Sequence, residues 1–525
     1  MKTNSNIFNR SLSGIVVCLV LLIIISAGCN GTEKKEENKK EVTAYQHWEL
    51  TDSLIIEGVE TEMMFHSNIP ADNISVESAQ GIVTLSGDVK NLLIRDEAEE
   101  IAGAIKGVRA IINQINVDVP DIPDGQLKDE VVQMLRQNTV TDKYEILVEV
   151  DDGEVQLSGT VDSWQEEMQA VNVTKSVRGV RAVDDKINFA YPETPRPDDE
   201  VARDIASALR NDVRVDDALI DVTVDNGEVT LSGTVGSVAE KSRTISNAWA
   251  AGVNDVNADN LEVETWARDP QMRQEKYVDK TDEEIELAVQ AALINDYRVN
   301  SFMIDVEVNS GVVTLKGNVD NLKAKKVAAE DAKNVVGVWR VNNDLEVRPV
   351  EFVNNKALAD QVRKTIQLHP YLDRYDIRVN VDEGDVELYG VVGSSFDKKQ
   401  AEDVASGMPG VVTVENYLEI EANEEVAGAV QAPVTDEQEE LTATETTKTD
   451  AEIKEQIEKQ LYWSPFVNEN EIKVTVENGN ATLTGQVDTE MEREAAERNA
   501  MQGGAVTVNN RLVVAYSQNT SQNGF

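Results

Sequence analysis

The stretch Gly227-Glu-Val-Thr-Leu-Ser-Gly233 decides the fold, because Val229 and Leu231 alternate with polar residues between two glycines. Alternation with a period of two is typical of a strand that buries one face. Asp225-Asn226 precede it, and an Asn-Gly pair favours a tight hairpin turn because it tolerates positive φ. The pattern G-x-V-x-L-x-G occurs at Gly81–Gly87, Gly153–Gly159, Gly227–Gly233, Gly311–Gly317 and Gly384–Gly390, and with Ala481 replacing Val at Gly479–Gly485. Such an internal repeat indicates six similar structural units.

Each unit follows the same order of elements. An amphipathic segment precedes the hairpin, and in the fourth unit Thr281 and Glu284 form the pattern of a helix capping box. A second helical segment follows the hairpin and leads to a third glycine and a last strand. That third glycine is Gly107, Gly179, Gly252, Gly337, Gly410 or Gly504. We therefore predict an α+β fold of six tandem α-β-β-α-β repeats, each with two helices packed on a three-stranded mixed sheet whose second and third strands are parallel.

The repeats and the segments between them define the expected domains. The repeats are expected at 50–118, 125–190, 197–265, 281–349, 354–422 and 449–516. The acidic stretch 423–448 is predicted to be a flexible linker that lets the sixth repeat swing away, and 517–525 to be a disordered tail. With short polar linkers elsewhere, the repeats are expected to form a string of beads or a curved array.

The N-terminus has the features of an export signal. The apolar run Leu12–Ile25 is followed by Ser26-Ala27-Gly28-Cys29, which resembles a bacterial lipoprotein signal, although Leu is usual where Ser26 stands. The resemblance implies a signal peptide at 1–28, a lipid on Cys29 and a polar tether at 29–49. An uncleaved membrane anchor and a plain secretory signal are the alternatives. Loss of Cys18 with the signal would leave the mature chain without a free thiol.

The composition excludes several classes of function. The 525 residues include 49 Lys and Arg against 96 Asp and Glu, so the formal net charge is −47. That charge repels nucleic-acid phosphates. Three His and two Cys supply almost no material for a metal site or a Cys-His nucleophile. We expect no enzyme, no metal and no cofactor.

Two apparent sites have simpler interpretations as scaffold. The glycine motif sits in a hairpin and lacks the Lys-Ser/Thr of a phosphate loop, so we interpret its glycines as structural. Acidic pairs lack the spacing of a calcium loop, so we interpret them as solvated surface. These pairs are Asp151-Asp152, Asp184-Asp185, Asp198-Asp199 and Asp216-Asp217.

Four residues are candidates for lipid contact. Trp164 stands near the start of a second helix, where an exposed indole could enter a headgroup layer. Lys323, Lys325 and Lys326 form a compact basic cluster on another second helix and could meet lipid phosphates. The alternatives are partial burial of Trp164 and a solvated helix face for the lysines.

Taken together, the hairpin motif, a helix leading into Gly-Val and a final N-x-L-x-V strand resemble the BON domain. Examples are Gly337-Val338 and Asn343-Asp-Leu-Glu-Val347. The resemblance implies phospholipid binding and a role in envelope integrity or osmotic stress. It places the chain in the bacterial envelope, lipid-anchored at the outer membrane and facing the periplasm or the cell surface. The expected partners are the membrane and phospholipid headgroups or envelope proteins, bound by several weak modules. The alternative is a protein-interaction scaffold. The sequence does not specify the oligomeric state.

Overall fold

The structure is a computed structural model. It describes residues 50–514 with gaps at 67, 139, 142–143, 190–195, 250–251, 269–279, 297, 300, 350–352, 421–448 and 465–466. The predicted signal peptide, Cys29, the tether, the 423–448 linker and the 517–525 tail lie outside the described residues. Among the residues it describes, no helix is both long and apolar enough to cross a bilayer.

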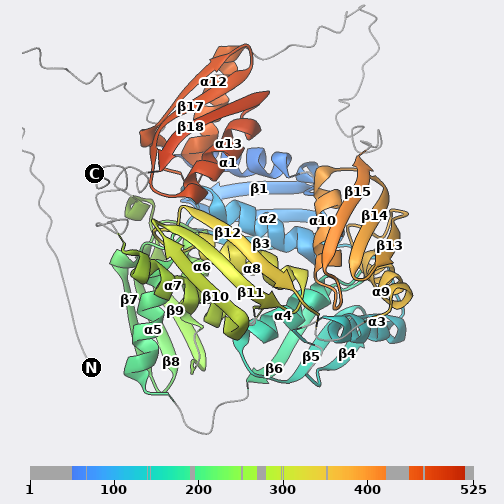
Figure 1. Cartoon of the computed structure of the whole chain (residues 1–525). Helices are drawn as coiled ribbons and strands as arrows, with labels where there is room; N and C mark the ends of the chain where they lie inside the picture. Colours follow the sequence, from blue (N-terminus) through green and yellow to red (C-terminus); the bar gives the residue numbers. More distant parts are fainter. Residues whose placement is uncertain are drawn as a thin grey trace, which may run out of the picture. The chain divides into compact units, whose positions relative to one another are not determined.

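Each repeat contains the two helices and three strands that the sequence predicts (Figure 1). The first helices are α1 (Asp52–Phe65), α3 (Asp124–Gln137), α5 (Asp198–Asn211), α7 (Asp282–Asn295), α9 (Asn355–Leu368) and α12 (Asp450–Trp463). The second helices are α2 (Leu92–Ala104), α4 (Trp164–Lys175), α6 (Val238–Ala248), α8 (Leu322–Lys333), α10 (Ser395–Ser406) and α13 (Glu490–Gln502). The predicted capping box of Thr281 and Glu284 is confirmed at the start of α7.

The strands form six three-stranded sheets. The first strands are β1 (Ile74–Ala79), β4 (Leu147–Asp151), β7 (Ile220–Asp225), β10 (Ile304–Asn309), β13 (Arg378–Asp382) and β16 (Ile472–Glu477). The middle strands are β2 (Ile82–Val89), β5 (Glu154–Val161), β8 (Glu228–Val235), β11 (Val312–Val319), β14 (Asp385–Val392) and β17 (Asn480–Val487). The last strands are β3 (Ala110–Val117), β6 (Ala182–Phe189), β9 (Asp255–Val263), β12 (Arg340–Val347), β15 (Thr413–Ile420) and β18 (Thr507–Val514).

The topology of each sheet is first, middle, last. The first and middle strands are antiparallel, as in a hairpin, whereas the middle and last strands are parallel because a helix connects them. In the fourth repeat Gly317 lies opposite Ile304 on one side and Leu345 on the other. The α+β fold and the mixed sheet are therefore confirmed.

One backbone hydrogen bond recurs between repeats that are far apart in the sequence. The residue before the third glycine of one repeat donates its N–H to the carbonyl of the last residue of another repeat's first helix. The donor–acceptor pairs are Lys106 to Trp463 at 3.3 Å, Arg178 to Leu368 at 3.0 Å and Val336 to Asn211 at 2.9 Å. The bond thus joins the first repeat to the sixth, the second to the fifth and the third to the fourth. We call this arrangement the nested pairing.

The nested pairing contradicts the expected string of beads, which would leave distant repeats apart. In the sixth repeat, Tyr462 and Trp463 are buried in the same apolar cluster as Ile105 of the first repeat. Gly58 on α1 makes room for them, since a Cβ there would lie 3.1 Å from the Trp463 ring. The sixth repeat is therefore docked on the first in this structure, in contact with it where the sequence predicted separation.

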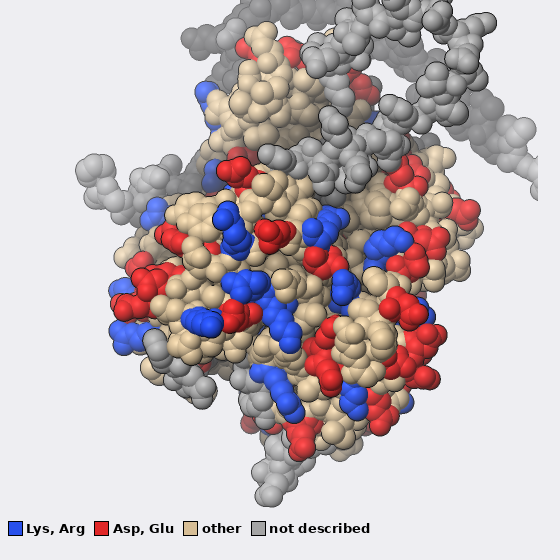
Figure 2. All heavy atoms as spheres, turned by 90° about the vertical axis from the view of Figure 1, so that its right-hand side faces the viewer, with Lys and Arg blue, Asp and Glu red and all other residues tan. Residues whose placement is uncertain are grey.

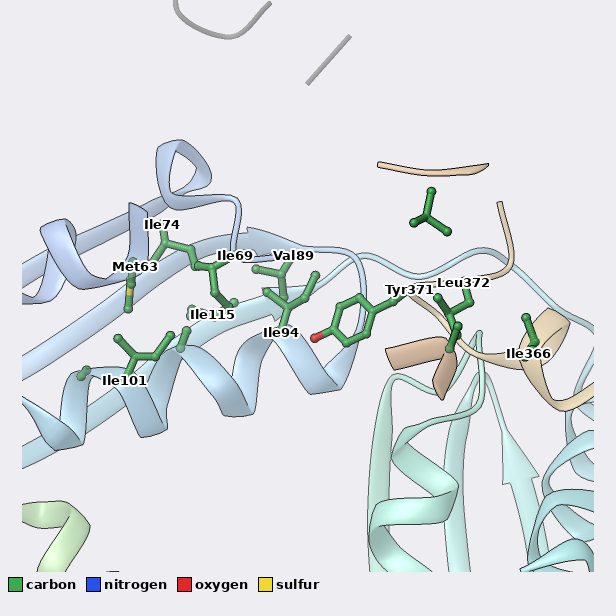
Figure 3. Packing of buried hydrophobic residues seen from close by; sticks show 14 of the residues in the cluster. Met63, Ile69, Ile74, Val89, Ile94, Ile101, Ile115, Ile366, Tyr371 and Leu372 are labelled. Atoms are coloured by element: carbon green, nitrogen blue, oxygen red, sulfur yellow. The ribbon is translucent and has the colours of Figure 1, made fainter. Parts of the chain in front are cut away.

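The same cluster extends from the first repeat into the fifth. Tyr371 and Leu372 follow α9, and Figure 3 shows the Tyr371 ring beside Ile94 of α2. Tyr371 also lies 3.5 Å from a carboxylate oxygen of Glu97. Apolar burial and a hydrogen bond at one junction indicate specific packing between repeats.

Candidate functional site

The turn of each hairpin is capped by a side chain from the start of the first helix. In the third repeat Asp198 accepts hydrogen bonds from the amides of Asn226 at 2.9 Å and Gly227 at 3.0 Å. Both turn residues have positive φ, as an Asn-Gly hairpin requires. The capping residues are Asp52, Asp124, Asp198, Asp282, Asn355 and Asp450. Because these side chains already occupy turn amides, the glycine motif offers little to a phosphate.

Sequence reasoning missed these caps, although a signal for them exists. An Asp stands 29 positions before the turn glycine in the third repeat, and the same spacing holds at Asp282. In the first repeat, hydrogen bonds from Ser78 and from the amides of Gly81 and Gln80 lower the pKa of Asp52. The five aspartate caps are charge-assisted contacts that hold the hairpin on the helix, and in the fifth repeat the neutral amide of Asn355 takes the same place.

The second motif glycine is required by close packing of the backbone. Gly233 has a φ of 114°, and a Cβ there would lie 2.0 Å from the carbonyl oxygen of Leu219. No side chain fits at such a distance. The glycine motif thus positions the hairpin and carries no reactive group.

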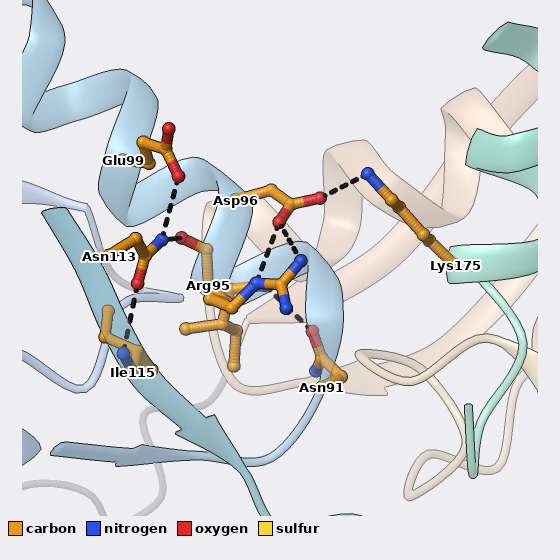
Figure 4. A network of polar contacts seen from close by, with 8 residues as sticks. Asn91, Arg95, Asp96, Glu99, Asn113, Ile115 and Lys175 are labelled. Carbon is orange, nitrogen blue, oxygen red and sulfur yellow. Dashed lines mark hydrogen bonds and ion pairs between the residues drawn. The ribbon is translucent and has the colours of Figure 1, made fainter. Parts of the chain in front are cut away.

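The asparagine of the N-x-L-x-V strand ties that strand to the second helix. In Figure 4, the Asn113 amide donates to the carbonyl of Arg95 at 3.2 Å, and its oxygen accepts from the Ile115 amide at 3.1 Å. Asn343, Asn416 and Asn510 donate in the same way to the carbonyls of Lys325, Lys398 and Arg493. This part of the motif is also scaffold.

The second repeat departs from that rule. Asp185 stands at the asparagine position, as Asp259 does in the third repeat, and Glu167 stands where the other repeats carry Lys or Arg. Burial, followed by the charge of Asp185 and a hydrogen bond to it, raises the pKa of Glu167 to about 8. The raised pKa favours the protonated form of Glu167 at neutral pH.

Trp164 lies at a junction between the second and third repeats. Its ring stacks on that of Trp249, with centroids 5.4 Å apart and planes 2° from parallel. The neighbouring Gln165 donates to the Trp249 carbonyl at 2.8 Å. The two rings line a cavity of about 480 Å³ together with Met168 and Ile294. Because Trp164 is half-buried against a second indole, insertion into a lipid layer would require that stack to open.

The predicted lysine cluster is divided by contacts to another repeat. The Lys326 ammonium lies 2.7 Å from Glu402 and 3.2 Å from Ser406, both on α10 of the fifth repeat. Lys325 is half-buried, whereas Lys323 is exposed. Lys323 is the member of the cluster best placed to meet a lipid phosphate, and that contact stays a prediction.

An exposed apolar surface occurs on the fourth repeat, at residues that the sequence did not indicate as a functional site. Leu287 and Ile294 lie on one line of α7 and are 60% and 67% exposed. The 3₁₀ turn η4 (Ser301–Met303), which packs against α7, carries Phe302 at 96% and Met303 at 54% exposure. We call these four residues the repeat-4 ridge.

The ridge differs from the equivalent positions of the other repeats most clearly at Leu287 and Phe302, whereas the first repeat also has an exposed apolar residue, Met64, at the position of Ile294. The residues five positions after the capping residue, where the fourth repeat has Leu287, are Glu57, Asp129, Arg203, Asp360 and Glu455. The middle residue of the 3₁₀ turn is Phe302 here and Asp72, Ala218 or Asn470 in three others. Exposure of four large apolar side chains on one repeat marks an interaction surface.

The charged surface shows no large basic area on the face drawn in Figure 2, where Lys and Arg are interspersed with Asp and Glu. No three His, Cys, Asp or Glu side chains of the described residues come together as metal ligands. The repeat-4 ridge is therefore the strongest candidate for a functional surface in that part of the chain.

Comparison with known proteins identifies the class. The BON domain matches residues 51–118, 123–191, 197–265, 281–349, 354–422 and 449–516, and the chain belongs to the BON-domain family. It is 33% identical over 143 residues to osmotically-inducible protein Y of Escherichia coli, covering 26% of this chain and 70% of that protein. It is 30% identical over 146 residues to the outer membrane lipoprotein DolP of Haemophilus influenzae, covering 26% of this chain and 75% of that protein.

Similarity to solved structures is much weaker. The C-terminal domain of CdsD, a structural protein of the type III secretion system of Chlamydia trachomatis, is 17% identical with a TM-score of 0.12. That match covers 41% of this chain and 100% of that domain. The predicted BON relationship is confirmed by the family match, and the two sequence relatives connect the chain to proteins of the bacterial envelope.

Proposed function

We propose that this chain is a non-enzymatic protein of the bacterial envelope, lipid-anchored through Cys29, whose fourth repeat inserts the repeat-4 ridge into a phospholipid surface. The ridge is the observation that carries the proposal, since Phe302 is 96% exposed on the 3₁₀ turn η4. The other repeats would serve as the frame that holds the fourth. A role in envelope integrity or osmotic stress follows from the relatives, one named for osmotic induction and one for the outer membrane.

The charge of the chain decides the mode of lipid binding. A net charge of −47 opposes adsorption to anionic lipid by Coulomb attraction. Apolar side chains that enter the headgroup boundary do not depend on that attraction, because burial of their surface supplies the free energy. The proposal therefore predicts binding that persists at high salt.

A protein-interaction scaffold is the second candidate. The nested pairing shows that the surfaces of these repeats can bind one another. An apolar ridge also suits a protein partner. Here the ridge would dock a second envelope protein, and purified lipid would not bind.

Liposome co-sedimentation of residues 30–525 distinguishes the two. We expect the double substitution Phe302→Ser, Met303→Ser to abolish sedimentation with zwitterionic vesicles at both low and high salt. Val506→Ser is the matched control, because Val506 is 74% exposed on the sixth repeat. Loss of binding in Trp164→Ala or in the triple Lys→Ala variant at 323, 325 and 326 would instead assign the contact to those residues. No sedimentation of the unaltered chain would favour the scaffold.

A further inference from the structure

The sixth repeat is held on the first by a small set of contacts. Besides Trp463, they include two ion pairs, Lys106 with Glu469 at 2.9 Å and Lys459 with Glu57 at 2.7 Å. The Lys106 ammonium also lies 4.0 Å from the centre of the Tyr462 ring. Attraction at this interface is therefore local, because apolar contact and close ion pairs act over a few ångströms.

The charges on the two repeats act in the opposite direction. Residues 51–118 contain twelve Asp and Glu against four Lys and Arg, and residues 449–516 contain twelve against six. Both repeats are therefore net acidic, and most of these side chains lie outside the interface. Their mutual repulsion extends over a Debye length, which is about 30 Å at 0.01 M salt and about 8 Å at 0.15 M.

We propose that docking of the sixth repeat on the first is a reversible switch that opens as ionic strength falls and closes as it rises. Salt screens the long-range repulsion before it weakens the short contacts, so the closed state gains from added salt. Most interfaces held by ion pairs show the opposite sign, because salt weakens the pairs themselves. This inference concerns the conformation of the chain and does not depend on the proposed lipid contact.

Three features make the switch possible in this pair in particular. Residues 423–448 provide the longest connection between two successive repeats, so undocking leaves the fifth repeat in place. The docking of Trp463 on the first repeat is specific, since Gly58 leaves room for the indole ring and a side chain at that position would crowd it. Finally, two further polar contacts of the sixth repeat, from Gln502 to Glu62 at 3.1 Å and from Lys333 of the fourth repeat to Glu494 at 3.6 Å, are not fully buried.

Chemical cross-linking measures the closed state directly. In the full chain carrying Cys18→Ser and Cys29→Ser, Glu62→Cys and Gln502→Cys would place two thiols across the interface. With a short bismaleimide reagent in non-ionic detergent, we expect cross-linking at 0.01 M salt to be at least about fivefold slower than at 0.15 M. The matched control is Gln133→Cys with Lys364→Cys, which joins the second and fifth repeats, and its rate should stay constant.

Two further variants test the cause. Glu77→Gln with Glu477→Gln neutralises two exposed carboxylates, on β1 and β16, that make none of the interface contacts described above, and should move the salt midpoint to lower concentration. Trp463→Ala should lower the cross-linking rate at every salt concentration. A cross-linking rate between the thiols introduced at positions 62 and 502 that is constant across the salt series, or that falls as salt rises, would overturn the proposal.

Discussion

The backbone N–H of Lys106 donates a 3.3 Å hydrogen bond to the carbonyl oxygen of Trp463, although the two residues belong to the first and the sixth repeats. The same two positions are bonded in the other two pairs of the nested pairing. The carbonyl at the end of a helix lacks an intrahelical partner. Docking gives this carbonyl a hydrogen bond from the backbone amide of another repeat. The same hydrogen bond is used in all three pairs of repeats.

Trp463 should dominate the docking of the sixth repeat. We expect Trp463→Ala to destabilise the docked state by about 3 kcal/mol, as truncation of a buried Trp usually does. Equilibrium urea denaturation would show an earlier transition for the sixth repeat. Trp266→Ala is the control, because Trp266 is 50% exposed and its loss should leave the curve unchanged.

Asp52 should make the first repeat sensitive to acid. Its folded-state pKa is lowered by hydrogen bonds from Ser78 and the turn amides, so its contribution to stability is present above the unfolded pKa and is lost as pH falls. Asp52→Asn should flatten the dependence of the melting temperature on pH below about 4. Asp72→Asn, on an exposed turn, should not. The fifth repeat, capped by Asn355, already carries the neutral group.

His66 should make the stability of the first repeat fall as pH rises, which is the opposite of the effect expected from Asp52. Contacts with Glu62 and Glu97 raise its pKa from 6.5 to about 9. A raised folded-state pKa means that the stabilisation is complete below the unfolded pKa and is lost as pH rises from about 6.5 to 9. Titration of the imidazole signals by NMR would measure it, and His369 provides a contrast because burial lowers its pKa to about 4. A midpoint for His66 near 6.5 would contradict the prediction.

The second repeat should gain stability from a basic residue at Glu167. The raised pKa of Glu167 means that stability is lost as pH rises from the unfolded value through about 8. Glu167→Lys restores the type of residue found in the other repeats and pairs it with Asp185. We expect a higher melting temperature at about pH 8 and a weaker pH dependence. Glu154→Lys makes the same change in charge at an exposed position and should have neither effect.

The elements within a repeat were predictable because local rules set them. Alternation in Val229 and Leu231 and the Asn226-Gly227 turn specify the hairpin, and Thr281 with Glu284 specifies the start of α7. The Asp198 cap was equally local and could have been found by comparing repeats at a fixed spacing. Local rules work here because each repeat forms its own small sheet.

The surfaces were not predictable in the same way. The bond from Lys106 to Trp463 joins backbone atoms, which no side-chain pattern records. Phe302 lies in a 3₁₀ turn outside the motif, so its 96% exposure follows only from the course of the chain around it. Lys326 looked like part of an open cluster and instead binds Glu402 of another repeat. Contacts between repeats depend on how whole repeats are placed against one another, and the periodic sequence pattern within a repeat contains no information on that placement.

The nested pairing also constrains how such a chain can evolve. In a linear array each unit touches its sequence neighbours, so a single unit can be deleted or duplicated with little disturbance. Here the first repeat is complementary to the sixth and the second to the fifth. Removal of one repeat would leave a matched surface without its counterpart. Descendants that keep this arrangement should therefore gain or lose repeats two at a time, with the members of each couple changing their contact residues together.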